Sequence, residues 1–317
     1  MRVGKRAAGI IILSSAVPLF LCFASWRLRH VPWEVPPEWR VPAPDPRPGG
    51  LSMRYLGVSG YEFNDGKTVV VTDPAFTRPT ALGLLGGPLR PDPALGELWC
   101  PAADYILISH AHYDHAVDAP GVALRTGATV VGTRSALNLA RSRGVPESKL
   151  IEAVPGAELK LGTFKVRIAA ARHSELFGRE DLMVGVIPPD AGPLWFWQYR
   201  QDGSLSFRLE AGGASVWHHP SAVYEKGDLG GIPADTLIMG VAGLDWTKER
   251  AAVLLAEAAP KRVLPTHYDN FFQPLGKGLA LLHIVDIQGA RRAVAAFRAD
   301  LPWVVLEPGG TTRLPAH

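Results

Sequence analysis

The sequence predicts a layered α/β domain that follows an apolar N-terminal segment. Three observations support this prediction. Strand-like runs come first in hairpin order, strand-like and helix-like stretches then alternate, and 47% of the 317 residues are hydrophobic, which is enough for a sizeable core. The length fits one large domain or two ordinary ones.

The N-terminus combines basic residues with an uncharged stretch, residues 7–25, of membrane-spanning length. A tryptophan and two arginines follow this stretch, as interfacial anchors do. We therefore expect residues 1–30 to be an uncleaved membrane anchor, with the bulk of the chain exported to the periplasmic or extracytoplasmic side. The alternative is a signal peptide cleaved after Ala24, which would leave a secreted protein.

A proline-dense stretch without apolar periodicity, residues 31–50, comes next. This composition predicts a semi-rigid extended linker. The alternative is an arm that packs along the domain through Trp33 and Trp39. In either case the folded domain is expected to cover residues 51–317.

Hairpin strands begin this domain, and Asn64-Asp65-Gly66 is a turn signal between two of them. The expected strands are 53–57, 61–63, 68–72, 105–108, 130–132, 158–161, 164–169, two or three between 193 and 216, 235–240, 262–264 and 303–306. The expected helices are 135–143 with Ser135 as its cap, 247–259 and 288–299.

Charge and cysteine content exclude several classes of protein. The 33 Lys and Arg residues nearly balance 30 Asp and Glu, and the net charge of +3 gives no basic surface for nucleic acid. The two cysteines, Cys22 and Cys100, are too few for a cysteine-rich zinc module. Because Cys22 lies in the apolar N-terminal stretch, no internal disulfide is expected.

A dense histidine cluster follows the expected strand 105–108, in the run Ser109-His110-Ala111-His112-Tyr113-Asp114-His115. Open α/β sheets place ligand sites at the carboxyl ends of strands. His110 and His112 are two apart, so in extended geometry they point the same way. Asp114 and His115 are expected in a loop that is free to fold back. Imidazole and carboxylate are the ligands of zinc, and the cluster therefore predicts a metal-dependent hydrolase site.

Two later histidines, His173 and His267, each follow an expected strand directly. Taken singly, each could be a half-buried histidine that binds nothing. Beside the first cluster, they are instead predicted to complete a binuclear site.

The pattern His-x-His-x-Asp-His after a short apolar strand resembles the metallo-β-lactamase fold. The longer phrase from Ser109 to Asp118, with Asp73-Pro74-Ala75-Phe76 upstream, is similar to the branch that includes N-acylphosphatidylethanolamine phospholipase D and the ascorbate-phosphate lactonases. The resemblance covers about residues 51 to 280. It implies a four-layer αββα sandwich.

The resemblance also implies two groups of ligands, one for each metal: His110, His112 and His173, and Asp114, His115 and His267. Asp73 would accept a hydrogen bond from a ligand imidazole and orient it; the alternative is an aspartate that only ends a strand in a turn. In the family, a Gly-Asp pair after a later strand bridges both metals. Here Ser221 or His219 stands at that position, depending on where the strand ends. Neither is a carboxylate, so the second metal should bind more weakly or differently.

The chemistry implied by this resemblance is hydrolysis by a zinc-activated hydroxide that Asp114 orients or deprotonates. The first hypothesis is a membrane-tethered zinc hydrolase of a phosphodiester, with lipids among the candidates. Aromatic residues support a lipid if they line a groove rather than the core: Trp195, Phe196, Trp197, Trp217, Phe271 and Phe272. The second hypothesis is a hydrolase of a lactone, amide or other carbonyl ester. The third, motivated by the missing aspartate, is a non-catalytic metal-binding or interaction protein.

Overall fold

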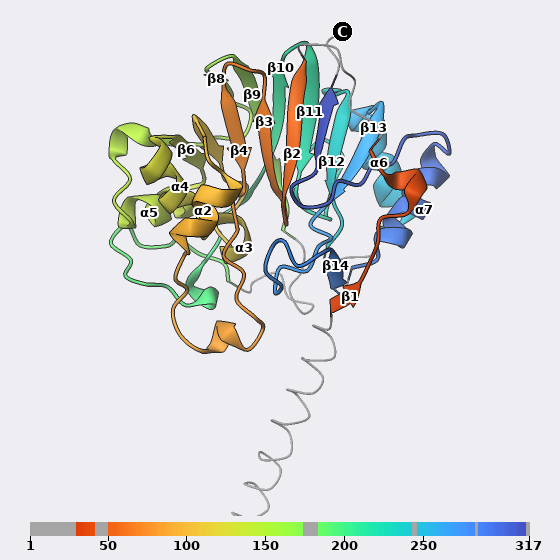
Figure 1. The fold of residues 1–317 in the computed structure, drawn as a ribbon. Helices are drawn as coiled ribbons and strands as arrows, with labels where there is room; N and C mark the ends of the chain where they lie inside the picture. Colours follow the sequence, from red (N-terminus) through yellow and green to blue (C-terminus); the bar gives the residue numbers. More distant parts are fainter. Residues whose placement is uncertain (1–29, 42–49, 174–182, 243–245, 283–284, 315–317) are drawn as a thin grey trace, which may run out of the picture.

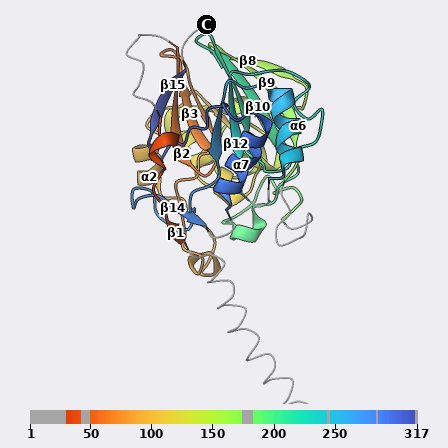
Figure 2. The ribbon, with the colours of Figure 1, turned by 90° about the vertical axis from the view of Figure 1, so that its right-hand side faces the viewer.

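Two β-sheets lie face to face in the computed structural model, with helices on both outer sides (Figures 1 and 2). The structure describes residues 30–41, 50–173, 183–242, 246–282 and 285–314. This mixed sandwich agrees with the predicted α/β class. It arises because most strands carry apolar side chains on both faces and must be covered on both.

The first sheet has seven strands in the order β15-β2-β3-β4-β5-β6-β7. Hairpins join its first part, and β4 to β7 run parallel. Asn64 accepts the backbone N–H of Gly66 at 2.7 Å in the predicted turn. The strand bounds are β2 (Leu51–Gly57), β3 (Gly60–Asn64), β4 (Val69–Thr72), β5 (Tyr105–Leu107), β6 (Thr129–Gly132), β7 (Leu150–Glu152) and β15 (Thr311–Leu314).

The second sheet has six strands in the order β13-β12-β11-β10-β9-β8. Its first three strands are parallel and the others are antiparallel. Gly212 and Gly213 have φ of +59° and +77° and make the tight turn between β10 and β11. The strand bounds are β8 (Glu158–Leu161), β9 (Phe164–Ala171), β10 (Ser204–Ala211), β11 (Ala214–His219), β12 (Thr236–Gly240) and β13 (Arg262–Thr266).

Alternating side chains divide the interior into two cores. Leu107 and Val131 belong to the core between the sheets, which also extends to α6 and α7. Their neighbours Ile106 and Val130 belong to the core under α2, α4 and α5. The helix bounds are α2 (Pro93–Trp99), α3 (Tyr113–Ala116), α4 (Ala119–Thr126), α5 (Arg134–Ser142), α6 (Lys248–Ala258) and α7 (Ile287–Phe297), with short 3-10 turns η1 (Pro37–Trp39), η2 (Gly83–Leu85), η3 (Glu147–Lys149) and η4 (Phe196–Gln198).

The described N-terminal residues lie along the domain as an arm. Strand β1 (His30–Pro32) pairs with β14 (Ala280–Leu282), Val35 and Trp39 are buried, and the ring of Trp39 lies 6.2 Å from that of Trp303. Residues 32–41 therefore have the packed arrangement rather than that of a free linker. The rest of the expected linker, residues 42–49, and the expected anchor up to residue 29 lie outside the described residues. The boundaries at residues 30 and 50 between anchor, linker and domain stay a prediction.

Among the described residues, no helix has the length and apolar character needed to cross a membrane. Cys22 also lies outside them, and Cys100 is buried and free.

Two local expectations were wrong. Residues 303–306 make only isolated bridges, of Trp303 with Val263 and of Val305 with Arg40, because each side of the segment meets a different neighbour. Ser135 does not cap α5, which begins behind Thr133; its hydroxyl instead accepts the N–H of Ile187 at 2.9 Å. The two or three strands expected between 193 and 216 are two, β10 and β11, and η4 precedes them.

Candidate metal centre

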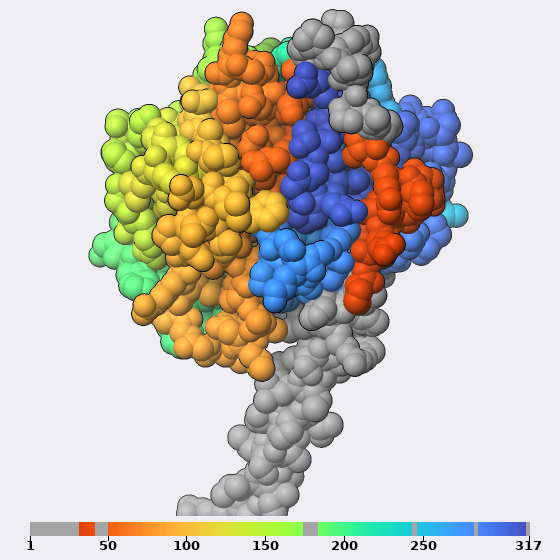
Figure 3. Space-filling model, in the orientation of Figure 1, coloured from red at the N-terminus to blue at the C-terminus, as the bar shows by residue number. Residues whose placement is uncertain are grey.

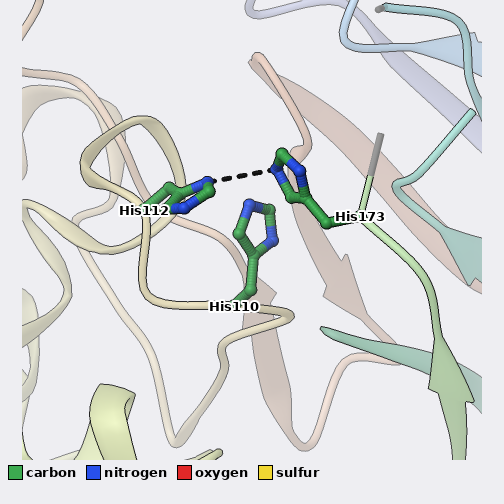
Figure 4. Close-up of side chains that lie close together, drawn as sticks. All are labelled: His110, His112 and His173. Carbon is green, nitrogen blue, oxygen red and sulfur yellow. Dashed lines mark hydrogen bonds between the residues drawn. The ribbon is translucent and has the colours of Figure 1, made fainter. Parts of the chain in front are cut away.

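Three imidazoles converge where β5 and β9 end. His110 and His112 follow β5, and His173 follows β9. One nitrogen from each ring lies within 4.8 Å of the other two, and Nδ1 of His112 is 3.1 Å from Nε2 of His173 (Figure 4). His110 and His112 are buried and His173 is half-buried. We call this set the first group.

The nitrogens of the first group fit a bound metal ion. Nε2 of His110 is buried and has no hydrogen-bond partner, whereas its Nδ1 lies 3.2 Å from the Ser109 hydroxyl. A buried polar atom without a partner is costly unless something binds it. The 3.1 Å between His112 and His173 is also close to the edge of a zinc tetrahedron, about 3.3 Å for Zn–N bonds of 2.0–2.1 Å.

Burial sets the charge of the first group. It lowers the pKa of His110 well below the usual value, and the neighbouring imidazoles add to this effect. Burial and then His173 lower the pKa of His112 to about 3. Both rings are therefore neutral near pH 7, which is the form that coordinates a metal.

A second group consists of Asp114 and His115 on α3 and His267 after β13. Oδ2 of Asp114 is 3.2 Å from Nε2 of His267 and 3.8 Å from Nε2 of His115. The expected loop at Asp114 and His115 is in fact a helical turn, because the His112 carbonyl accepts the N–H groups of His115 and Ala116, each at 3.0 Å.

Asp73 orients the imidazole of His115. This aspartate is fully buried, and its Oδ2 accepts Nδ1–H of His115 at 2.9 Å and the Ser109 hydroxyl at 2.6 Å. Its Oδ1 accepts the Ser109 N–H at 2.7 Å. Because Nδ1 of His115 is held by Asp73, Nε2 faces Asp114. The sequence predicted this acceptor but missed Ser109, which contacts Asp73, His110 and His115 at once.

The charges of the second group depend on one another. Burial opposes a charge on His115, but Asp73 and Asp114 outweigh it and raise its pKa. Burial likewise opposes ionisation of Asp114, yet His115 and His267 outweigh it and lower its pKa. Asp114 is therefore a carboxylate near pH 7.

The two groups form one cluster. The ring centroids of His110 and His115 are 3.9 Å apart, and those of His115 and His267 are 5.2 Å apart. The structure thus brings together all six residues that the resemblance implied as ligands, from strand ends of both sheets. Each group offers three donors, which leaves a position open for water or substrate, as catalytic zinc sites do.

Neither residue proposed for the bridging position joins the cluster among the described residues. His219 is buried on the opposite side of β11, where Nδ1 contacts the Ser206 hydroxyl at 2.7 Å and Nε2 contacts the Val223 carbonyl at 3.1 Å. Alternation along β11 explains this, because it is His218 that faces the Ser59 carbonyl between the sheets, at 2.8 Å. Ser221 lies beside the site, and its hydroxyl donates to the Arg172 carbonyl.

A buried ion pair fixes the segment that carries His267. Asp269 accepts Nη1 of Arg78 at 2.7 Å on one oxygen, and Val58 N–H and the Tyr55 hydroxyl at 2.8 and 2.6 Å on the other. The Val58 carbonyl in turn accepts the N–H of His267, whose φ is +60°. This network holds an unfavourable backbone conformation at a candidate ligand. No pattern in the sequence pairs Arg78 with Asp269, because 191 positions separate them.

Comparisons with known proteins agree with this geometry. Residues 52–267 match the model of the beta-lactamase superfamily domain. A UPF0173 metal-dependent hydrolase of Symbiobacterium thermophilum is 28% identical over 271 residues, which cover 83% of this chain and all of that protein. A second such hydrolase, from Heliobacterium modesticaldum, is 28% identical over 283 residues, 84% of this chain and 99% of its own.

Solved structures share the fold. Igni18, a metallo hydrolase of Ignicoccus hospitalis, has a TM-score of 0.54 at 20% identity and covers 83% of this chain and 98% of its own. An isothiocyanate hydrolase from Delia radicum gut bacteria has a TM-score of 0.55 at 12% identity and covers 84% of this chain and all of its own. With its matching family model, its sandwich fold and its histidine cluster, the chain belongs to the beta-lactamase superfamily, as a metallohydrolase of the metallo-β-lactamase fold.

Proposed function

We propose that this metallohydrolase uses zinc to cleave a phosphodiester and that residues 1–30 tether it to a membrane. The observation that carries the proposal is the adjacency of the two three-donor groups, with His110 and His115 rings 3.9 Å apart. Two ions held side by side suit in-line displacement at phosphorus, because they can stabilise both the attacking and the leaving oxygen.

In this proposal the first group holds one ion and the second group holds the other. Bound there, zinc supplies a water of lowered pKa and polarises an oxygen of the substrate. The Asp114 carboxylate accepts a hydrogen bond from the attacking water and orients it; its lowered pKa makes it a weak proton acceptor. Asp73 keeps the His115 ring turned so that Nε2 faces the site.

One observation favours a second candidate, hydrolysis of a lactone, amide or other carbonyl ester. Ser221 offers no carboxylate to bridge two ions, and its hydroxyl is engaged by the Arg172 carbonyl. A single ion in the first group is sufficient to polarise a carbonyl. The isothiocyanate hydrolase of similar fold also, by its name, acts at carbon rather than phosphorus.

A panel of substrates with metal analysis separates these candidates. The full-length protein is purified, its metals are counted and identified by mass spectrometry, and bis(4-nitrophenyl) phosphate is compared with lactone and ester substrates. We expect two zinc equivalents and phosphodiester turnover, both lost in His110→Ala. Turnover of lactones or esters alone, with one equivalent of metal, selects the second candidate. No turnover of either class rejects both.

A further inference from the structure

An uncharged loop follows Arg78, whose partner Asp269 lies two positions after the candidate ligand His267. Residues 79–89 contain no acidic or basic side chain, and Arg78 and Arg90 flank them. Leu84 and Leu89 are buried, whereas Leu82 is 74% exposed and Leu85 is 57% exposed. The loop therefore presents a pair of leucines to its surroundings although it already has buried leucines to anchor it.

This loop is fixed at both ends to residues near the site. At its start, the Thr77 hydroxyl donates to Asp118 at 2.7 Å and Arg78 pairs with Asp269, two positions after His267. At its end, the Leu89 N–H donates to the Leu194 carbonyl at 2.7 Å, next to η4. The position of the exposed leucines relative to the metal centre is therefore set by the fold.

A tryptophan on η4 adds a third exposed apolar side chain. Trp197 is 43% exposed and stacks on Trp195 with 4.8 Å between ring centroids. Phe196 lies 6.4 Å from Tyr113, which stands between His112 and Asp114 in the sequence. We call Leu82, Leu85 and Trp197 the rim surface. Exposed leucine and tryptophan are side chains that enter a bilayer interface.

The described chain begins at this same end of the molecule. Strand β1 lies at the lower end in Figure 1 and Figure 2, and Figure 3 shows the orange atoms of the 79–89 loop projecting at that end. Only residues 26–29 separate the apolar stretch 7–25 from His30, a span of at most about 18 Å. A bilayer that holds residues 7–25 would therefore lie close to β1.

We propose that the rim surface docks on the lipid bilayer, so that the metal centre receives an amphiphilic phosphodiester from the membrane. Leu82, Leu85 and Trp197 enter the interface, and the exposed Arg90 meets anionic headgroups. The substrate class and the membrane tether rest on the proposed function, whereas the exposure of the rim surface does not. Other exposed apolar residues, such as Leu98 and Leu124, are carried by α2 and α4 and offer matched controls.

Depth-dependent fluorescence quenching tests the docking. In full-length Cys22→Ser protein, Leu82→Cys or the control Leu98→Cys, which replaces a 70% exposed residue, is labelled with an environment-sensitive dye. Vesicles of phosphatidylcholine and phosphatidylglycerol carry doxyl-labelled lipid. We expect at least twofold quenching and a blue shift at position 82 and neither at position 98. No quenching at 82, or equal quenching at both, overturns the docking.

A second pair of variants links docking to catalysis. The rim variant Leu82→Glu/Leu85→Glu is compared with the control Leu98→Glu/Leu124→Glu. For each variant, the rate of hydrolysis of a phosphodiester lipid in vesicles is divided by the rate with soluble bis(4-nitrophenyl) phosphate. The ratio should fall about tenfold for the rim variant only; equal ratios contradict membrane delivery of the substrate. Loss of the proposed function would appear differently, as no turnover of either substrate by the parent protein while quenching at position 82 persists.

Discussion

The two halves of the metal centre are built differently. In the first group, burial and then the neighbouring imidazoles keep His110 and His112 neutral, and the donor nitrogens already face one another. In the second group, a carboxylate and a hydrogen-bonded imidazole balance each other's charge, and the pKa of His115 is raised. An ion entering the second group must compete with a proton on His115, whereas one entering the first does not. We therefore expect the first group to bind metal more tightly.

Among the described residues the two groups share no carboxylate, and this widens the difference. Two divalent ions side by side repel each other strongly in a buried site, and a shared carboxylate normally reduces that repulsion. Ser221 is one of the two residues proposed for that position, and its hydroxyl donates to the Arg172 carbonyl instead. Occupation of the first group should therefore weaken binding at the second. The two halves can be distinguished by variants that act on one of them alone.

Replacing His110 should have the largest effect. His110→Ala removes a donor of the first group and opens space beside His115, whose ring is 3.9 Å away. We expect loss of both metal equivalents and a fall in kcat/KM of about 10³-fold or more. Mass spectrometry of the metals and substrate kinetics measure this. His219→Gln changes an imidazole outside both groups and should keep the metal; metal loss in that variant as well would point to misfolding.

Replacing His267 should affect one half only. His267→Ala removes the imidazole whose Nε2 lies 3.2 Å from Oδ2 of Asp114, but it removes no donor of the first group. We expect metal content to fall from two equivalents to one and turnover to fall about 100-fold. Titration of zinc into metal-free protein counts the remaining sites. Loss of both equivalents would contradict this expectation, because it would mean that the first group does not hold its ion without His267.

Asp73 should have a smaller effect, through His115. Asp73→Asn keeps one oxygen for the Ser109 N–H but presents an amide nitrogen to the Ser109 hydroxyl and the His115 ring. Such changes behind a ligand typically weaken metal affinity about 10–100-fold. Competition with a chromophoric chelator measures this for the weaker ion. Asp65→Asn, at a half-buried turn aspartate outside both groups, is the control and should leave both affinities unchanged.

Local sequence patterns predicted much of this fold and most of the cluster. The strand before His110, the turn at Asn64 and the helices near 135, 247 and 288 were confirmed, because periodicity, turn residues and caps act over a few residues. Strands β1, β14 and β15 were missed, since each depends on a partner distant in sequence. For the same reason the Arg78–Asp269 pair was not predicted. The position of His219 was also predicted wrongly, because the side of the sheet on which its ring lies depends on the register of β11.

A substitution at Ser221 has the smallest expected effect but is the most specific test, because it should raise the metal affinity of a site rather than lower it. Ser221→Asp places a carboxylate at the backbone of Arg172, the residue before His173, and should tighten the weaker ion about tenfold, since one added negative charge lowers the repulsion between the two ions. The new carboxylate loses the bond to the Arg172 carbonyl, which limits the gain.

Ser221→Ala separates these two contributions, because it removes the hydroxyl without adding charge; we expect it to leave metal affinity unchanged. Zinc titration of the metal-free proteins compares the three chains. If Ser221→Asp binds the second ion no more tightly than Ser221→Ala does, then Ser221 does not occupy the bridging position. The weakness of the second group would then come from the charge balance of Asp114 and His115 alone.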